Sequence, residues 1–173
     1  FASVSPEDKL YRYRVVEAML HADIPISKVD DLRTLLERSN NSLTGSQHLK
    51  VFIPKIETRE HEKLRSEITG QLVTIIFDGT TRLGEALVIL VRWIPADFSR
   101  VEQRLSAFRT TFKHTTGDGL SRLIMQVLLT TVKIDSLYVV GGARDSCSTN
   151  GVAMRAIKAL LTKLQDFMCI SHT

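Results

Sequence analysis

The sequence predicts an α/β protein in which a small helical region precedes a mixed β-sheet. Apolar residues recur at helical spacing up to Gly70, and from Leu72 onward short apolar runs rich in β-branched residues replace that pattern. Three such runs follow one another with turn signals between them, which is typical of an antiparallel meander. A helical segment then leads to a fourth run, as expected for a connection to a parallel strand. We therefore divide the chain into a helical region, 1–70, and a sheet region, 71–173.

Three helices are expected in the helical region. The first begins at Ser5-Pro6-Glu7-Asp8, which combines an N-cap serine, a proline at the first helical position and acids in the first turn. The second runs from Ser27 to about Arg38. The third begins near Thr44 and is expected to be interrupted by Pro54. The charged residues that follow are interpreted as a solvated helix face with local ion pairs.

The sheet region is expected to hold its elements in the order β-β-β-α-β-α. The predicted elements are strands at Leu72–Phe77, Glu85–Ile94 and Arg100–Phe112, a helix at Leu120–Val132, a strand at Ser136–Val140 and a helix at Val152–Met168. Gly141-Gly142 is expected to end the fourth strand. A doubly wound parallel sheet would need a helix between Phe77 and Glu85, where none fits. The prediction is therefore a mixed sheet of three antiparallel strands and one parallel strand, with flanking helices.

Composition excludes several classes of protein. The 173 residues are 43% hydrophobic and 24% charged, unlike a disordered tail, a coiled-coil rod or a collagen-like fibre. The longest apolar runs, Leu72–Phe77 and Ala86–Val91, are too short to span a bilayer, so no membrane partner is expected. The cysteines, Cys147 and Cys169, are too few for a disulfide scaffold and fit a reducing compartment. The start at Phe1 suggests a piece of a longer polypeptide.

The net charge of +4 lies entirely in the sheet region. Residues 1–70 hold eleven basic and eleven acidic side chains, whereas residues 71–173 hold twelve basic and eight acidic ones. A mild basic excess suits contact with a nucleic-acid backbone, although it is also common on solvated surfaces. DNA is therefore a candidate partner of the sheet region.

Two aspartates stand at the ends of predicted strands. Asp78 ends the first strand and is followed by Gly79, and Asp145 lies just beyond the fourth strand. Carboxylates at neighbouring strand ends suit a hard divalent cation such as Mg²⁺ or Mn²⁺, which takes oxygen ligands. Two such ions can activate an attacking oxygen and stabilise a leaving one in phosphodiester chemistry. The alternative is that Asp78 caps a turn and Asp145 caps the following helix.

Other candidate motifs are weaker. Cys169 and His172 form a single Cys-x-x-His pair, which offers only two of the four ligands that zinc needs. No Gly-x-Ser-x-Gly elbow, Walker loop or dinucleotide fingerprint occurs. The remaining histidines have no partner at metal-ligand spacing and are interpreted as surface or core residues: His21, His48, His61 and His114.

Five short segments follow one another through the sheet region. They are Phe77-Asp78-Gly79-Thr80-Thr81, Arg104-Leu105-Ser106-Ala107-Phe108-Arg109, His114-Thr115-Thr116-Gly117, Asp145-Ser146-Cys147-Ser148-Thr149-Asn150 and Cys169-Ile170-Ser171-His172. Their order and separations resemble the catalytic core of the hAT-superfamily DNA transposases. The segment Ala22-Asp23-Ile24-Pro25-Ile26-Ser27-Lys28-Val29-Asp30 is similar to a stretch of the vertebrate CGG-repeat-binding proteins.

The resemblance implies a ribonuclease H-like sheet and metal-dependent DNA cleavage and strand transfer by the full-length protein. Asp78 and Asp145 would supply two of three acids that hold Mg²⁺ or Mn²⁺ in the complete site. Asn150, Cys169 and His172 would support the second acid. The family's third acid, a glutamate, lies beyond an inserted helical domain, so the isolated chain is expected to be inactive.

The resemblance further implies a nuclear protein that binds DNA and self-associates at full length. Binding of DNA by this chain alone should be weak and carried by phosphate contacts. The family usually has a Trp shortly after the first acid, where this chain has Gly79-Thr80-Thr81. That departure keeps a second hypothesis open, in which the chain is a transposase-derived DNA-binding or protein-interaction module without catalysis.

Overall fold

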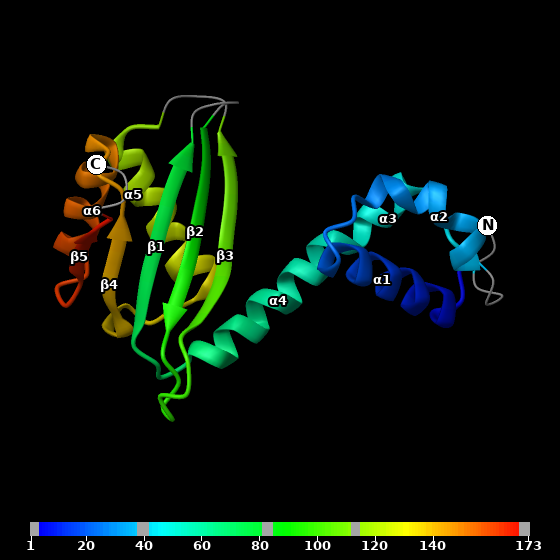
Figure 1. Ribbon diagram of the computed structural model, residues 1–173, viewed down its shortest axis with the longest axis horizontal. Coiled ribbons are helices and arrows are strands. Elements are labelled where there is room, and N and C mark those ends of the chain that lie inside the picture. Colours follow the sequence, from blue (N-terminus) through cyan, green and yellow to red (C-terminus); the bar gives the residue numbers. More distant parts are fainter. Residues whose placement is uncertain (1–3, 38–41, 81–84, 112–114, 170–173) are drawn as a thin grey trace. The chain divides into compact units, whose positions relative to one another are not determined.

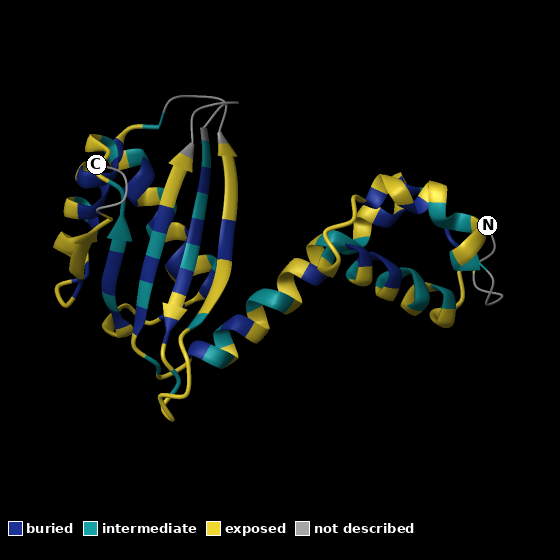
Figure 2. Cartoon of the chain, in the orientation of Figure 1, coloured by how far each residue is buried: buried dark blue, intermediate teal, exposed yellow. Residues whose placement is uncertain are grey.

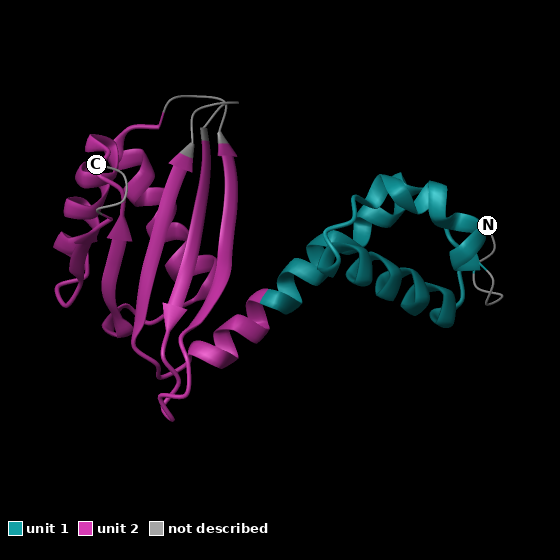
Figure 3. Cartoon of the chain, viewed as in Figure 1, with its two compact units in different colours: residues 1–60 teal, residues 61–173 magenta. Residues whose placement is uncertain are grey.

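The chain forms two compact units, Phe1–Glu60 and His61–Thr173 (Figures 1 and 3). The computed structural model describes residues 4–37, 42–80, 85–111 and 115–169. The division falls at residue 60, within helix α4 (Ile53–Ile68), rather than at residue 70 as the sequence indicates. The reason is that Leu64 and Ile68, in the last turns of α4, are buried in the apolar core of the second unit.

The first unit consists of short helices around a small core. The elements are α1 (Pro6–His21), η1 (Ile26–Lys28), α2 (Val29–Leu36), α3 (Ser46–Leu49), η3 (Lys50–Phe52) and the first part of α4. Helix α1 begins as predicted, because the Ser5 hydroxyl accepts a hydrogen bond from the backbone N–H of Asp8 at 3.0 Å. The predicted third helix begins at Ser46, and the 3₁₀ turn η3 interrupts it just before Pro54. Pro54 is the second residue of α4, a position that tolerates its missing N–H.

An Asp–Arg pair holds the segment between α2 and α3. Asp30 Oδ1 accepts hydrogen bonds from Arg33 Nη2 at 2.9 Å and from the Ser46 backbone at 3.3 Å. Arg33 Nη1 also donates to the carbonyl of Leu43 at 2.6 Å. The hydrogen bonds from Ser46, and then those from Arg33, lower the pKa of Asp30 below its ordinary value of 3.8.

This lowered pKa predicts acid sensitivity of the first unit. A carboxyl group whose pKa is lower in the folded state contributes stability above its unfolded pKa and loses it as the pH falls. We therefore expect the hydrogen-exchange protection factors of buried amides such as Val16 and Leu49, which are corrected for the slower intrinsic exchange in acid, to fall below about pH 4. Asp30→Asn should flatten this pH dependence, whereas Asp31→Asn, which removes an exposed pair with Lys28, should leave it intact. Equal pH profiles for wild type and Asp30→Asn would contradict the assignment.

The second unit is built on a five-stranded mixed sheet. Its strands are β1 (Val73–Thr80), β2 (Glu85–Trp93), β3 (Glu102–Thr111), β4 (Val139–Arg144) and β5 (Gln165–Met168), in the spatial order β3-β2-β1-β4-β5. The pairs β1–β2 and β2–β3 are antiparallel, and the pairs β1–β4 and β4–β5 are parallel. The α/β class, the antiparallel meander and the presence of a parallel fourth strand are as predicted. The fourth strand is Val139–Arg144 rather than Ser136–Val140, because Ser136–Tyr138 form a 3₁₀ turn, η5.

Two further predictions about the second unit were wrong. The helix expected at Val152–Met168 is α6 (Ser148–Leu160), and a fifth strand, β5, follows it. Gly141-Gly142 does not end β4 but lies inside it. A Cβ at Gly142 would come within 2.4 Å of Met154 Cε of α6, so this glycine permits close packing of the helix on the strand. The helix expected at Leu120–Val132 is α5 (Gly117–Gln126), followed by a π-helical turn, η4 (Val127–Val132).

The two faces of the sheet differ in burial (Figure 2). On β1, Val73, Ile75 and Phe77 are at most 1% exposed and belong to a core shared with α5 and α6. Helix α5 lies behind the sheet in Figure 1. We call this side the helix face. The opposite side, the outer face, carries residues that are half-buried or exposed among those described: Thr74, Ile76, Asp78, Val88, Leu90, Leu105, Phe108, Ala143 and Phe167. No helix in the described ranges is long and apolar enough to cross a membrane.

Candidate functional site

The first candidate acid, Asp78, lies near the carboxyl end of β1. Strand β1 is fixed by the burial of Phe77, the residue before it, which is 1% exposed on the helix face. Because side chains alternate along a strand, Asp78 lies on the outer face, and it is exposed. Its Oδ1 accepts a hydrogen bond from the backbone N–H of Gly79 at 2.8 Å. Its second oxygen, Oδ2, takes no part in that bond.

The second candidate acid, Asp145, directly follows β4 and precedes α6. Its Oδ1 accepts hydrogen bonds from the Cys147 backbone at 3.0 Å and from Asn150 Nδ2 at 2.6 Å. Asp145 is half-buried, and Asn150 is only 6% exposed. The Asn150 amide therefore orients the carboxylate from the first turn of α6. Oδ2 of Asp145 takes part in neither bond.

The pairing of β1 with β4 places the two acids at equivalent positions. The last pair in this parallel ladder is Ile76 with Ala143. Asp78 lies two residues after Ile76, and Asp145 lies two residues after Ala143. Both acids therefore occupy the carboxyl ends of neighbouring parallel strands, which is the placement that the sequence predicts. Their convergence on a shared ligand remains a prediction.

The predicted supporting residues are placed unequally. Asn150 bonds directly to Asp145. Cys169 is exposed, and its backbone N–H donates to the carbonyl of Arg144 at 2.7 Å, one residue before Asp145. Cys169 thus lies beside the end of β4 through its main chain. His172 lies outside the described residues.

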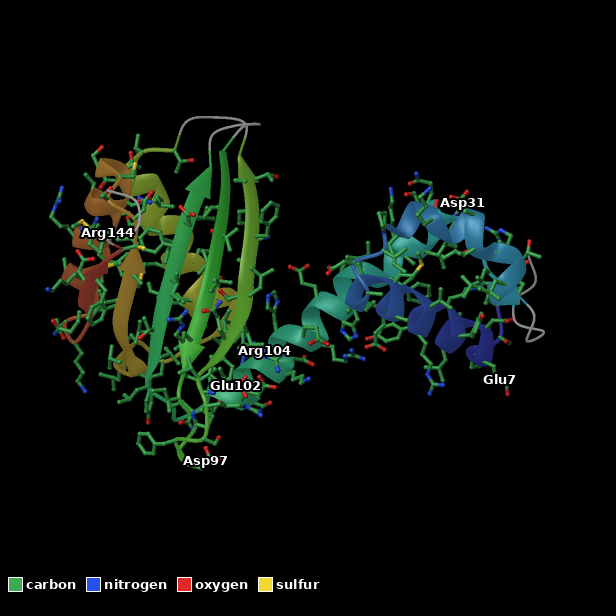
Figure 4. All side chains as sticks on the ribbon, viewed as in Figure 1. Glu7, Asp31, Asp97, Glu102, Arg104 and Arg144 are labelled. Atoms are coloured by element: carbon green, nitrogen blue, oxygen red, sulfur yellow. The ribbon has the colours of Figure 1, made fainter. Side chains whose placement is uncertain are left out.

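Sequence reasoning missed an ion pair that secures the end of β4. Arg144 donates from Nε and Nη2 to the two carboxylate oxygens of Asp166 on β5, at 3.1 and 3.0 Å (Arg144 is labelled in Figure 4). Nη1 of Arg144 also donates to the main-chain carbonyl of Asp145 at 3.0 Å. The side chains are 14% and 26% exposed, so this two-pronged pair is shielded from water. It fixes the backbone that carries Asp145, and it was not foreseen because β5 was assigned to a helix.

A second ion pair ties β3 to the part of α4 that belongs to this unit. Arg104 Nε lies 3.5 Å from Glu67 Oε2, and Arg104 is seen beside α4 in Figure 4. His61 Nε2 lies 3.0 Å from the carbonyl oxygen of Ser106, next to the irregularity in the β2–β3 pairing. These contacts anchor β3, the edge strand that β2 separates from the two strands carrying the acids.

The donor set at the two acids fits a hard cation. Two carboxylates, held by backbone or amide donors through one oxygen each, offer oxygen ligands of the kind that Mg²⁺ and Mn²⁺ take. The thiol of Cys169 is a softer ligand and does not suit these ions. The chain matches no protein-family model, and no curated protein is significantly similar to it.

Proposed function

We propose that this chain is part of a ribonuclease H-like nucleic-acid-processing core of the hAT transposase type. In this proposal Asp78 and Asp145 hold Mg²⁺ or Mn²⁺, and the full-length protein cleaves DNA phosphodiesters and transfers strands. The observation that carries the proposal is the equivalent placement of the two acids at the ends of β1 and β4. Nuclear localisation and self-association of the full-length protein belong to the same proposal.

The strand order gives independent support. In the sheet β3-β2-β1-β4-β5, the central strand β1 has an antiparallel neighbour on one side and a parallel neighbour on the other. The chain runs from β1 outward to β3 and then crosses to the other side of β1 to form β4. In open α/β sheets, ligands bind at the carboxyl ends of the strands where the chain changes direction in this way. Asp78 and Asp145 stand at these two ends.

The residues of the chain have separate tasks in this proposal. A bound divalent cation would supply Lewis-acid stabilisation of charge on phosphate oxygens. Asp78 and Asp145 would bind and position that cation through the oxygens that their local hydrogen bonds leave available. Asn150 orients Asp145, and the Arg144–Asp166 pair holds the strand end in place. Each of these contacts forms before any ligand binds, so little reorganisation is required.

DNA binding is proposed to be weak and electrostatic. Several basic side chains are exposed on or just after the helices that cover the helix face: Arg122, Arg155, Lys158 and Lys163. Contacts of such residues with phosphates release counterions, so the affinity should fall steeply as salt is raised. These side chains lie on the helix side of the sheet, whereas Asp78 lies on the outer face. DNA affinity and metal affinity are therefore separable measurements.

One observation favours the second candidate function, a non-catalytic module. Both acids already accept local hydrogen bonds, Asp78 from Gly79 and Asp145 from Cys147 and Asn150. Side chains that cap a turn or a helix make such bonds without any ligand. In that case the two aspartates stabilise strand ends, and the chain contributes only binding.

Titration with Mn²⁺ distinguishes the two candidates. The paramagnetic ion broadens NMR signals of nearby nuclei, so one shared site should broaden the amide signals of Gly79 and Ser146 over the same range of Mn²⁺ concentration. Asp78→Asn and Asp145→Asn should each weaken this binding about tenfold or more, because each removes one of the carboxylates that the ion requires. Both variants keep an oxygen that accepts the local hydrogen bonds.

Asp97→Asn provides the matched control. Asp97 is an exposed aspartate in the same unit, and its carboxylate accepts hydrogen bonds from the Ser99 backbone and hydroxyl at 3.1 and 2.9 Å. It follows β2 at the opposite end of the sheet from Asp78, so its replacement should leave the binding near Gly79 unchanged. Wild-type Mn²⁺ binding by both Asp78→Asn and Asp145→Asn would contradict the catalytic proposal and favour the non-catalytic module.

A further inference from the structure

A second group of metal-ligating side chains lies in the first unit, apart from the two aspartates. Glu17 and His21 come from α1, and Glu60 comes from α4. One ligand atom from each residue lies within 4.8 Å of the others. Among the described residues, no other group of three or more His, Cys, Asp or Glu side chains brings its ligand atoms this close together. From the sequence alone, His21 is interpreted as a surface or core residue without a metal partner.

The helices present these three groups to one another for simple geometric reasons. Glu17 and His21 are four residues apart, so they lie one above the other on the same side of α1. The turn η3, which leads directly into α4, contacts α1 through an edge-to-face pair of the Tyr13 and Phe52 rings, whose centroids are 6.2 Å apart. The guanidinium of Arg59 lies over the Tyr13 ring at 5.5 Å. The scaffold around the cluster is therefore packed.

From this arrangement we propose that Glu17, His21 and Glu60 bind a transition-metal dication such as Zn²⁺, which joins α1 to α4. Two carboxylates and one imidazole form a ligand set that suits Zn²⁺ with water in the fourth position. Ligands of one tetrahedral zinc lie about 3.3 Å apart, given bond lengths of about 2 Å. The ligand atoms thus need to approach by at most about 1.5 Å, which side-chain rotation can supply.

Arg59 decides how the site behaves without metal. It pairs with Glu17 Oε1 and, at 2.9 Å, with Glu60 Oε1, so its positive charge holds the two carboxylates together. Arg59 therefore keeps the carboxylates close while opposing the dication by charge repulsion. An ion-pair network that binds no metal is the competing explanation of the same contacts.

Titration of the full chain with ZnCl₂ separates these explanations. Both cysteines are exposed thiols, so the titration uses a Cys147→Ser/Cys169→Ser background. Calorimetry should show that one equivalent of zinc binds saturably. His21→Ala should lower the zinc affinity at least 10–100-fold, the loss that removal of even an outer-shell partner of a metal ligand typically causes. His48→Ala is the matched control, because His48 is an exposed histidine in the same unit. It should leave the affinity unchanged.

Arg59→Gln gives an opposite prediction. Removing a unit positive charge about 4 Å from a dication should strengthen zinc binding about 30-fold, because the repulsion is twice that between two unit charges. The side-chain ¹⁵N signals of His21 should shift on zinc addition while those of His48 stay in place, and a circular dichroism spectrum of metal-free His21→Ala should match the parent. Absence of saturable binding in both the parent and Arg59→Gln, or parent-like affinity of His21→Ala, would overturn the proposal.

Discussion

Replacing Phe77 by Ala is expected to lower the free energy of unfolding of the second unit by about 3–5 kcal/mol. Phe77 is among the largest fully buried side chains, at 1% exposure, and it lies in the central strand β1 opposite Ile89 of β2. Its removal leaves a cavity between the sheet and the helices that neighbouring side chains cannot fill. Trp93, which is 5% exposed in the same core and is the single tryptophan, reports the transition by fluorescence during urea unfolding.

Phe108→Ala is the matched control for this substitution. Phe108 lies on the edge strand β3, on the outer face of the sheet, and is 56% exposed. Its truncation removes little buried area, so the change should stay within about 0.5 kcal/mol. Similar losses of unfolding free energy from Phe77→Ala and Phe108→Ala would contradict the difference in burial between the two faces of the sheet.

Gly117→Ala is expected to destabilise the second unit by about 2–3 kcal/mol. A Cβ at this position would lie 2.5 Å from both Cβ and Cγ1 of Val152 and 3.0 Å from the carbonyl oxygen of Thr149. Val152 is β-branched and belongs to α6, so it cannot move aside without shifting the helix. The glycine therefore sets how closely α5 approaches α6, and added volume must separate them.

Gly119→Ala tests the same chemical change two residues later in α5. There the nearest atoms to a new Cβ are Thr115 Cγ2 at 3.3 Å and Thr116 Oγ1 at 3.4 Å. The gain in helix propensity, about 1 kcal/mol, should offset this mild crowding and leave stability nearly unchanged. Val152→Ala should rescue Gly117→Ala only in part, because it removes Cγ1 but leaves Cβ. An unfolding free energy for Gly117→Ala equal to that of Gly119→Ala would contradict the close helix approach.

The strands of the antiparallel meander could be predicted because their signals are local. β1 and β2 are apolar runs bounded by turn residues, and the predicted bounds differ from the observed ones by at most a few residues. β5 could not be predicted in this way. It is a short strand of four exposed residues, and it exists only because β4 offers hydrogen-bonding partners. The prediction that Gly142 ends the fourth strand was wrong for a related reason, because this glycine allows packing against Met154 rather than forming a turn.

The candidate sites show the same division. Asp78 could be identified because it directly follows an apolar strand signal, and Asp145 because it lies shortly beyond the next such signal. The register between β1 and β4 agrees with that placement. The partnership of Arg144 with Asp166 depends on the pairing of β4 with β5, which no local pattern encodes. Glu17 and His21 lie four residues apart on one helix, but the sequence does not mark them as ligands, because Glu60 joins them only through the packing of α4 on α1.

The position of Mn²⁺ in crystals of this chain tests the central proposal most directly. Anomalous scattering from crystals soaked in Mn²⁺ should show a peak bonded to carboxylate oxygens of both Asp78 and Asp145, at about 2.2 Å from each. The oxygens should be those that do not accept the hydrogen bonds from Gly79 and Asn150. A fully soaked crystal with both carboxylates in their local hydrogen bonds and no manganese between them would contradict the proposal that the two aspartates form one metal site.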